Sequence, residues 1–310
     1  QEELGEQVQS TFIDGLSAHN MYEKLSESAT DADLLLITAS ELAIPSLRFS
    51  LEHPDCLTLV YSRIREDFRL STYYGRYYEA IFLCGMAAAM ATNSKKVAYI
   101  TPRLDYKRHT ADINAFGLGV KAVRGDAEVF LVRKDVLPLQ PATSVHGLMA
   151  AAELGADIAY TPRYIGLKNI ELPEEVFSFI SRIDTDGNPT EFIAAPKWDW
   201  GRYYTELVSN YLNGSLDILS IIDRGDPSVT GLWWGLGAGV LRFLVTDRLG
   251  TSSVQLLHYM RSSIARDSFN PFYGPIRDQE GRLRIQEDLG LRPYEVLNME
   301  WLCDFIQVIG

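Results

Sequence analysis

The chain contains little of what usually identifies an enzyme or a metalloprotein. Only three of its 310 residues are cysteine, Cys56, Cys84 and Cys303, and no two of them form a C-x-x-C pair. We therefore expect buried thiols, and neither a disulfide framework nor a zinc site. The five histidines are scattered, and none lies in an H-E-x-x-H or His-x-His pattern. The sequence predicts no metal and no cofactor.

Motifs for nucleophilic catalysis and for phosphate binding are also missing. The chain has no G-x-S-x-G elbow, so an α/β-hydrolase nucleophile has no candidate. The glycines of Gly235–Gly239 have the spacing of neither a Walker loop nor a Rossmann fingerprint, and we expect them to serve helix packing. No spacing nominates two carboxylates as general acid and base. We therefore expect a protein that is not an enzyme, and a nucleoside-processing enzyme is the least favoured function.

Positive charge and long apolar runs are scarce as well. The chain has 29 basic and 41 acidic residues, a net charge of −12. Binding to a nucleic-acid backbone needs a clustered positive surface, so nucleic acid is not an expected partner. The apolar run 81–91 is shorter than the about 18–20 residues that span a bilayer, and we expect it to be a core helix.

Short apolar runs alternate with segments of helical spacing along most of the chain. This alternation predicts an α/β protein whose parallel sheets carry helices on both faces. The expected strands are Leu34–Ala39, Leu57–Tyr61, Val97–Thr101, Glu128–Val132, Asp157–Thr161 and Glu191–Ala195. The expected helices are Tyr77–Ala91, Ala111–Val123, Ser144–Leu154, Tyr203–Leu212 and a final one over Pro293–Phe305. We expect a surface turn over 183–190 and a loop with a hairpin-like turn over 268–284.

Four of the five tryptophans fall in two short stretches, Trp198–Tyr204 and Gly231–Gly239, where they alternate with glycine, charge and tyrosine. A tryptophan beside glycine lets a planar ligand approach closely, and a neighbouring Asp or Lys can then contact its polar edge. Stacking of a base on one aromatic ring contributes about 1–3 kcal/mol. The alternative is that these tryptophans only seal the junction between two lobes.

Three expected strands end in small or polar residues before a helix. These ends are Thr38–Ser40, Thr101–Arg103 and Thr161–Arg163. In an open parallel sheet, ligands bind beyond the carboxyl ends of the strands, where helix N-termini also point. Thr38 and Ser40 are therefore candidate ligand contacts, although Ser and Thr at such positions also serve as helix caps.

Several motifs, taken in their order along the chain, resemble the basic membrane protein family of substrate-binding proteins, which includes purine nucleoside receptors. Each motif alone is weakly specific, but their order and spacing together are specific, and they cover nearly the whole chain. They are Tyr74–Gly85, Lys96–Ile100, Ile113–Gly119, Gly155–Ile158, Trp198–Gly201, Asn213–Gly214, Trp233–Leu236 and Asn298–Trp301.

The resemblance implies a type I periplasmic-binding fold with two doubly wound parallel-sheet lobes, joined by chain crossings at a hinge. The N-terminal lobe would comprise 1–102 and about 198–228, and the C-terminal lobe about 103–197 and 229–310. The family's first strand and first helix have no counterpart in these residues. Since a lobe without its first strand would leave an open slot in its sheet, we expect a preceding segment, cleaved and still bound or absent from this sequence.

The same resemblance implies a ligand site in the cleft between the lobes, with a nucleoside base stacked on aromatic rings and its ribose held by Asp and Lys. Trp198, Trp200 and Trp233 would stack, and Lys197 and Asp199 would bind hydroxyls. Asp105 and Tyr106 would form the opposite wall, with Thr38 and Ser40 as further contacts.

The expected function is that of the ligand-binding component of an ABC-type uptake system, which passes a nucleoside or similar small aromatic ligand to a membrane permease. The resemblance implies an extracytoplasmic, membrane-anchored lipoprotein whose anchor is not in this chain. The alternative is an intracellular, cytoplasmic ligand-sensing regulator on the same fold, which reduced cysteines would also suit.

Overall fold

The structure is a computed structural model that describes residues 4–62, 70–102, 109–134, 142–162, 170–173, 176–216 and 231–310. The chain divides into two compact units. Unit 1 comprises Gln1–Gly75 and Trp200–Trp234, and unit 2 comprises Arg76–Asp199 and Gly235–Gly310. Three connecting segments therefore pass from one unit to the other, at 75/76, 199/200 and 234/235.

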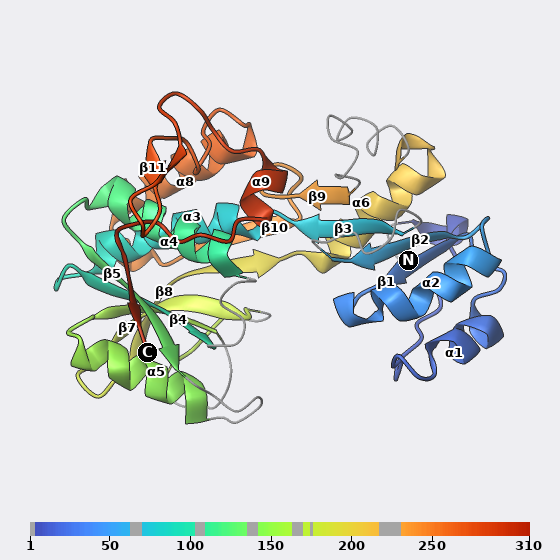
Figure 1. Cartoon of the computed structure of the whole chain (residues 1–310), viewed down its shortest axis with the longest axis horizontal. Coiled ribbons are helices and arrows are strands. Elements are labelled where there is room, and N and C mark those ends of the chain that lie inside the picture. The colour runs from blue at the N-terminus through green and yellow to red at the C-terminus, as the bar shows by residue number, and fades with distance from the viewer. Residues whose placement is uncertain are drawn as a thin grey trace. The chain divides into compact units, whose positions relative to one another are not determined.

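Unit 1 is built on a parallel sheet in the order β1-β2-β3-β9. Its strands are β1 (Leu34–Ile37), β2 (Leu57–Tyr61), β3 (Ser71–Gly75) and β9 (Gly231–Trp234). Its helices are α1 (Met21–Ser28), α2 (Ala43–Glu52) and α6 (Trp200–Leu212), with short 3-10 turns at Gly5–Gln7 and Ser40–Leu42. Apolar residues of α1, α2, β1 and β2, among them Leu25, Phe49 and Val60, form its core. Figure 1 labels the strands and helices of this unit.

Unit 2 contains a seven-stranded sheet in the order β10-β8-β7-β6-β4-β5-β13. The strands β6, β4, β5 and β13 are parallel, whereas β7, β8 and β10 extend the sheet by antiparallel pairing. They are β4 (Lys96–Pro102), β5 (Glu128–Lys134), β6 (Ile158–Pro162), β7 (Ser178–Ile183), β8 (Pro189–Trp198), β10 (Leu241–Val245) and β13 (Ile306–Ile309).

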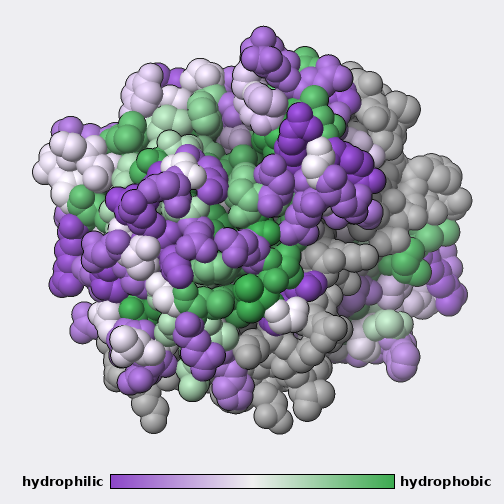
Figure 2. Space-filling model, turned by 60° about the vertical axis from the view of Figure 1, so that its left-hand side comes forward, coloured by the Kyte–Doolittle hydropathy of each residue, from purple (hydrophilic) through white to green (hydrophobic). Residues whose placement is uncertain are grey.

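Helices lie on both faces of this sheet. On one face α5 (Ala142–Glu153) packs through Leu148 against Ile100 and Phe130. The helices α3 (Tyr77–Ala91) and α4 (Thr110–Val123) lie on the other, where Phe116 contacts Tyr99 and Tyr160. Further elements are a 3-10 turn at Asp247–Leu249, α8 (Thr251–Ala265), the hairpin β11 (Ile276–Arg277) with β12 (Leu283–Ile285), and α9 (Pro293–Leu297). The face drawn in Figure 2 is mostly hydrophilic, with smaller hydrophobic groups between the polar side chains.

The α/β class with parallel-sheet cores is confirmed, and each of the six expected strands is present. The turn over 183–190 is the tip of the β7–β8 hairpin, which the sequence analysis did not pair. The expected helix Pro293–Phe305 is wrong in its length, because α9 ends at Leu297 and the chain then leads to β13. Residues 76–102, placed with the N-terminal lobe from the sequence, belong to unit 2, where β4 pairs with β5 and β6.

The helices α3 and α4 approach so closely that glycine is needed at their contact. A Cβ atom at Gly85 would lie 2.0 Å from the backbone oxygen of Phe116, and one at Gly119 would lie 2.0 Å from that of Phe82. Beside this contact, buried Asn114 donates to the Trp301 carbonyl (2.8 Å) and accepts from the Cys303 amide (2.9 Å). The motifs Tyr74–Gly85, Ile113–Gly119 and Asn298–Trp301 therefore contain residues that hold α3, α4 and the C-terminal segment together.

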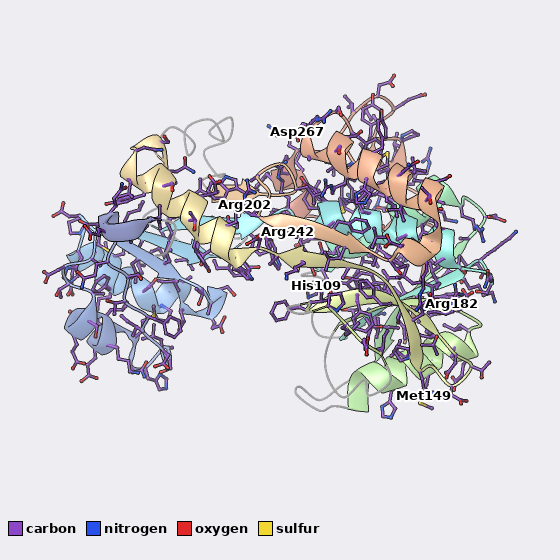
Figure 3. The ribbon with its side chains drawn as sticks, turned by 180° about the vertical axis from the view of Figure 1, so that it is seen from behind. His109, Met149, Arg182, Arg202, Arg242 and Asp267 are labelled. Atoms are coloured by element: carbon purple, nitrogen blue, oxygen red, sulfur yellow. The ribbon has the colours of Figure 1, made fainter. Side chains whose placement is uncertain are left out.

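Asp157 in the Gly155–Ile158 motif joins two loops of unit 2. Its carboxylate accepts hydrogen bonds from the Thr92 and Ser94 hydroxyls and from the backbone amides of Asn93 (2.7 Å) and Ser94 (3.2 Å). The Arg182 guanidinium lies 3.5 Å away (Figure 3). Partial burial alone would raise the pKa of Asp157, but these donors outweigh burial and lower it.

We expect Gly85→Ala to destabilise the protein by about 3 kcal/mol or more, because the added methyl group meets a backbone oxygen that cannot move without separating the helices. Gly125→Ala is the matched control, since a Cβ there would have no heavy atom within 4 Å. Urea unfolding of both variants measures the difference. Equal stability of the two variants would show that the helices are not in backbone contact.

We expect Asp157→Asn to lower the free energy of unfolding at pH 7 by about 2 kcal/mol, because charge-assisted hydrogen bonds are lost. A lowered pKa stabilises the fold above the ordinary carboxyl pKa, and this contribution disappears as the pH falls through the folded-state pKa. The free energies of unfolding of wild type and variant should therefore converge as the pH falls below the ordinary carboxyl pKa of about 3.9. Asp186→Asn, at an exposed position of unit 2, is the control. A pH-independent difference between wild type and Asp157→Asn would contradict this account.

Candidate functional site

Four half-buried aromatic residues gather at the carboxyl ends of the unit 1 strands. These residues, Tyr61, Tyr74, Trp200 and Tyr204, are named here the unit 1 aromatic cluster. Tyr61 ends β2 and contacts Tyr74 of β3, with ring centroids 5.1 Å apart. Trp200, at the start of α6, meets Tyr61 edge-on at 5.5 Å and stacks on Tyr204 at 5.8 Å. Half-burial leaves part of these rings accessible to a planar ligand.

Buried tyrosine hydroxyl groups hold this cluster in place. The Tyr203 hydroxyl of α6 shares its one hydrogen between the backbone oxygens of Tyr74 (2.9 Å) and Leu232 (2.8 Å). Tyr73 donates to the Ile37 oxygen (3.2 Å), and its hydroxyl lies 3.1 Å from that of Tyr204. Burial raises the pKa of Tyr73 and Tyr203, so both phenols keep their protons at neutral pH. These hydrogen bonds fix α6 against the strand ends of β1, β3 and β9.

Thr38, Ser40 and Trp233 lie at the same edge of the unit 1 sheet. Thr38 and Ser40 follow β1 and are exposed, and Ser40 opens the 3-10 turn Ser40–Leu42. Trp233 pairs in register with Tyr74 but is only 9% exposed, so little of its ring can meet a ligand. Its neighbour Trp234 is half-buried and contacts Tyr203 at 5.0 Å.

In unit 2, Trp198 ends β8 and stacks on Tyr77 of α3, with ring centroids 5.5 Å apart and an interplanar angle of 13°. The Tyr77 hydroxyl forms a 2.7 Å hydrogen bond with the Ser178 hydroxyl at the start of β7. Because β8 runs in the same direction as β6, Trp198 lies at the carboxyl edge of the parallel strands. Burial raises the pKa of Tyr77 well above its ordinary value.

Asp199, for which a ligand contact is predicted, forms two contacts within unit 2. Its carboxylate pairs with Arg242 of β10 at 2.5 Å, and its amide donates to the Val240 oxygen at 2.8 Å (Figure 3). Lys197 lies beside it on β8, half-buried and in register with Arg242. Asp105 and Tyr106 lie outside the described residues.

The predicted site residues therefore fall into two groups. Lys197, Trp198 and Asp199 belong to unit 2, whereas Thr38, Ser40, Trp200 and Trp233 belong to unit 1. Four tyrosines beside these residues were not predicted as ligand contacts from the sequence: Tyr61, Tyr74, Tyr77 and Tyr204. Their signal was present, since Tyr61 ends a predicted strand and the others lie in tyrosine-rich motifs.

The cysteines behave as expected from the sequence. All three are free and buried, and burial raises the pKa of the Cys84 and Cys303 thiols. Within the described ranges, no three His, Cys, Asp or Glu side chains are grouped so that they could hold a metal ion. None of the helices in these ranges has the length and apolar character that crossing a bilayer requires.

Comparisons with known proteins found relatives of low sequence identity. No protein-family profile matches the chain. A purine-binding protein of Brucella abortus is 22% identical over 288 residues, covering 90% of this chain and 77% of that protein. A putative ABC transporter glucose-binding protein of Haloferax volcanii is 21% identical over 213 residues, 68% of this chain and 51% of that protein, so the chain spans about half its length.

Solved structures show the same architecture. An ABC transporter solute-binding protein of Conexibacter woesei has a TM-score of 0.52 and 14% identity, over 87% of this chain and 90% of that one. A transcriptional activator of the comK gene from Bacillus halodurans has a TM-score of 0.53 and 12% identity, over 81% and 84%. The fold is periplasmic-binding-like, and the resemblance to substrate-binding proteins of the basic membrane protein family is confirmed, at low identity.

Proposed function

We propose that the protein is the ligand-binding component of an ABC-type uptake system and that its ligand is a nucleoside or a similar small aromatic molecule. The observation that carries this proposal is the unit 1 aromatic cluster, whose half-buried rings lie where an open parallel sheet binds ligands. The relative from Brucella abortus, described as purine-binding, supports a planar ligand.

The proposed roles follow from the exposure of each side chain. Trp200 stacks on the ligand ring, and Tyr61 and Tyr74 flank it. Thr38 and Ser40, exposed beside the cluster, bind polar groups of the ligand. Trp198, Lys197 and Asp199 of unit 2 stay proposed ligand contacts, as do Asp105 and Tyr106. Trp233 stays a proposed contact only through the 9% of its surface that is exposed. For Asp199, ligand binding competes with the ion pair to Arg242.

The proposed partners are this small molecule and a membrane permease that receives it. The proposed location is extracytoplasmic. The proposed activity is binding without catalysis, in keeping with relatives that are described as binding proteins.

A second candidate is a ligand-sensing regulator, favoured by the likeness in fold to the transcriptional activator from Bacillus halodurans. Uptake measurements distinguish the two. Deletion of the gene should abolish uptake of the labelled ligand if the protein serves a permease, whereas a regulator should change transcript levels in response to the same ligand.

For the wild-type protein, we expect purine nucleosides to raise the melting temperature by several degrees at about 100 times the dissociation constant, which corresponds to about 2.7 kcal/mol. Trp200→Ala should weaken binding about 10- to 100-fold, because one stacking ring is lost. Isothermal titration of both proteins measures the change in affinity.

The control is Tyr259→Ala, which removes a ring that is 69% exposed on α8 and far from the cluster in sequence. Stabilisation by glucose and not by nucleosides would overturn the nucleoside proposal in favour of a sugar ligand. Unchanged nucleoside affinity in Trp200→Ala would overturn the role of the unit 1 aromatic cluster.

A further inference from the structure

Glu79 lies in the first turn of α3, and its side chain is 4% exposed. A carboxylate so deeply buried needs partners that replace water. Its Oε1 lies 3.2 Å from Nη1 of Arg76, and its Oε2 accepts a 2.8 Å hydrogen bond from the backbone amide of Leu236. Burial raises the pKa of Glu79, while Arg76 and the Leu236 amide oppose that rise.

These two partners belong to different connecting segments. Arg76 is the first residue of unit 2 after the connection at 75/76, and Leu236 is the second residue after the connection at 234/235. One buried side chain therefore holds the unit 2 ends of two of the three connections. The third, at 199/200, is held by other groups, through the contacts of Asp199 with Val240 and Arg242.

Glycine at position 235 lets the carboxylate reach the backbone. A Cβ atom there would lie 2.3 Å from Oε2 of Glu79. Two residues on, a Cβ at Gly237 would lie 2.6 Å from the backbone oxygen of Ala265, at the end of α8. The Gly235–Gly239 segment therefore packs closely against Glu79 of α3 and against the end of α8. This agrees with the helix-packing role predicted for its glycines.

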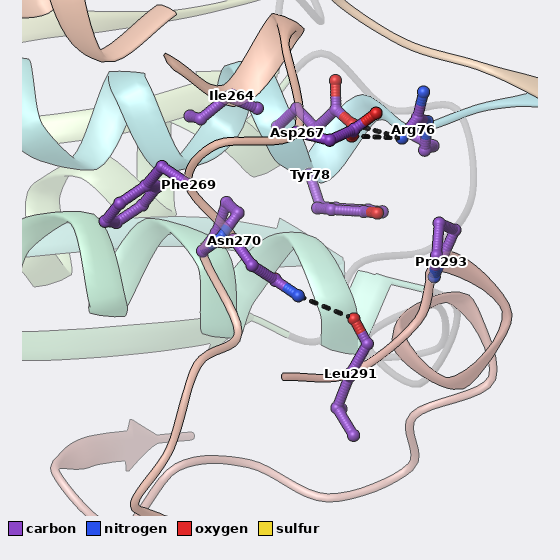
Figure 4. Close-up of a pocket in the computed structure, with 10 residues that line it drawn as sticks. Arg76, Tyr78, Ile264, Asp267, Phe269, Asn270, Leu291 and Pro293 are labelled. Atoms are coloured by element: carbon purple, nitrogen blue, oxygen red, sulfur yellow. Dashed lines mark hydrogen bonds and ion pairs between the residues drawn. The ribbon is translucent and has the colours of Figure 1, made fainter. Parts of the chain in front are cut away.

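A cavity of about 110 Å³ borders this arrangement within unit 2 (Figure 4). Arg76, Tyr78, Glu79, Asp267 and Asn270 are among the residues that line it. Arg76 also pairs with Asp267 at 3.6 Å, and the Asp267 side chain is 82% exposed. Solvent thus reaches Arg76 from the Asp267 side, whereas the bond from Glu79 to the Leu236 amide is buried.

We propose that Glu79 is a positioning residue that ties two of the three connecting segments together in unit 2 and thereby limits how far the two units move relative to each other. The role requires no particular ligand, so it goes beyond the proposed function and does not depend on it.

The test uses the ligand-free protein. Cysteines introduced by Glu27→Cys in α1 and Gln255→Cys in α8, both exposed positions, carry spin labels whose distance distribution is measured by pulsed EPR. Glu79→Gln keeps an acceptor for the Leu236 amide but removes the charge that pairs with Arg76, and Gly235→Ala displaces the carboxylate. Both variants should broaden the distribution, and Glu79→Ala should broaden it most.

Asp126→Asn is the matched control, because it removes an exposed carboxylate of unit 2 that pairs only with Lys95 in the described ion pairs. It should leave the distribution unchanged. A lower melting temperature in Glu79→Gln and Gly235→Ala, with distributions as narrow as that of the control, would show a merely structural role and overturn the proposal. Equal broadening in the control would overturn it as well.

Discussion

The backbone contact between α3 and α4 is the constraint on which the arrangement of unit 2 around α3 depends. Gly85 and Gly119 let the two helices approach until backbone faces backbone. The position of α3 is thereby fixed over the sheet, and its first turn carries both Tyr77, which stacks on Trp198, and Glu79, which holds two connecting segments. The position of α3 therefore determines both the Tyr77–Trp198 stack and the contacts of Glu79 with two connecting segments.

In unit 1, tyrosine hydroxyl groups hold the helix α6 and the strands in place. Its strands are short and parallel, and the carbonyl groups of Ile37, Tyr74 and Leu232 accept hydrogen bonds from Tyr73 and Tyr203. A phenol combines a large apolar ring with one donor, so it can pack in a core and still satisfy a buried carbonyl. The unit 1 aromatic cluster is placed by these bonds, which explains why tyrosine is so frequent beside Trp200.

Much of the fold was accessible from the sequence because the central strands and helices are strongly apolar. The helix Tyr77–Ala91 and the strand Leu57–Tyr61 were predicted with the bounds that the structure gives them. The strand Ser71–Gly75 was not predicted because its serine, threonine and tyrosine residues do not form an apolar run, although three of its five residues are buried. The strand Ile306–Ile309 was not predicted because it pairs with β5, which is far away in the sequence. The ion pair of Asp199 with Arg242 was missed for the same reason, since the partners are 43 residues apart.

The unit 1 aromatic cluster is proposed to bind a planar ring. A crystal structure of the protein with a purine nucleoside tests it most directly. The claim predicts the base in van der Waals contact with Trp200, at about 3.5–4.0 Å, with Tyr61 or Tyr74 at its edge. A nucleoside bound away from these rings, with the cluster unchanged and unoccupied, would contradict it.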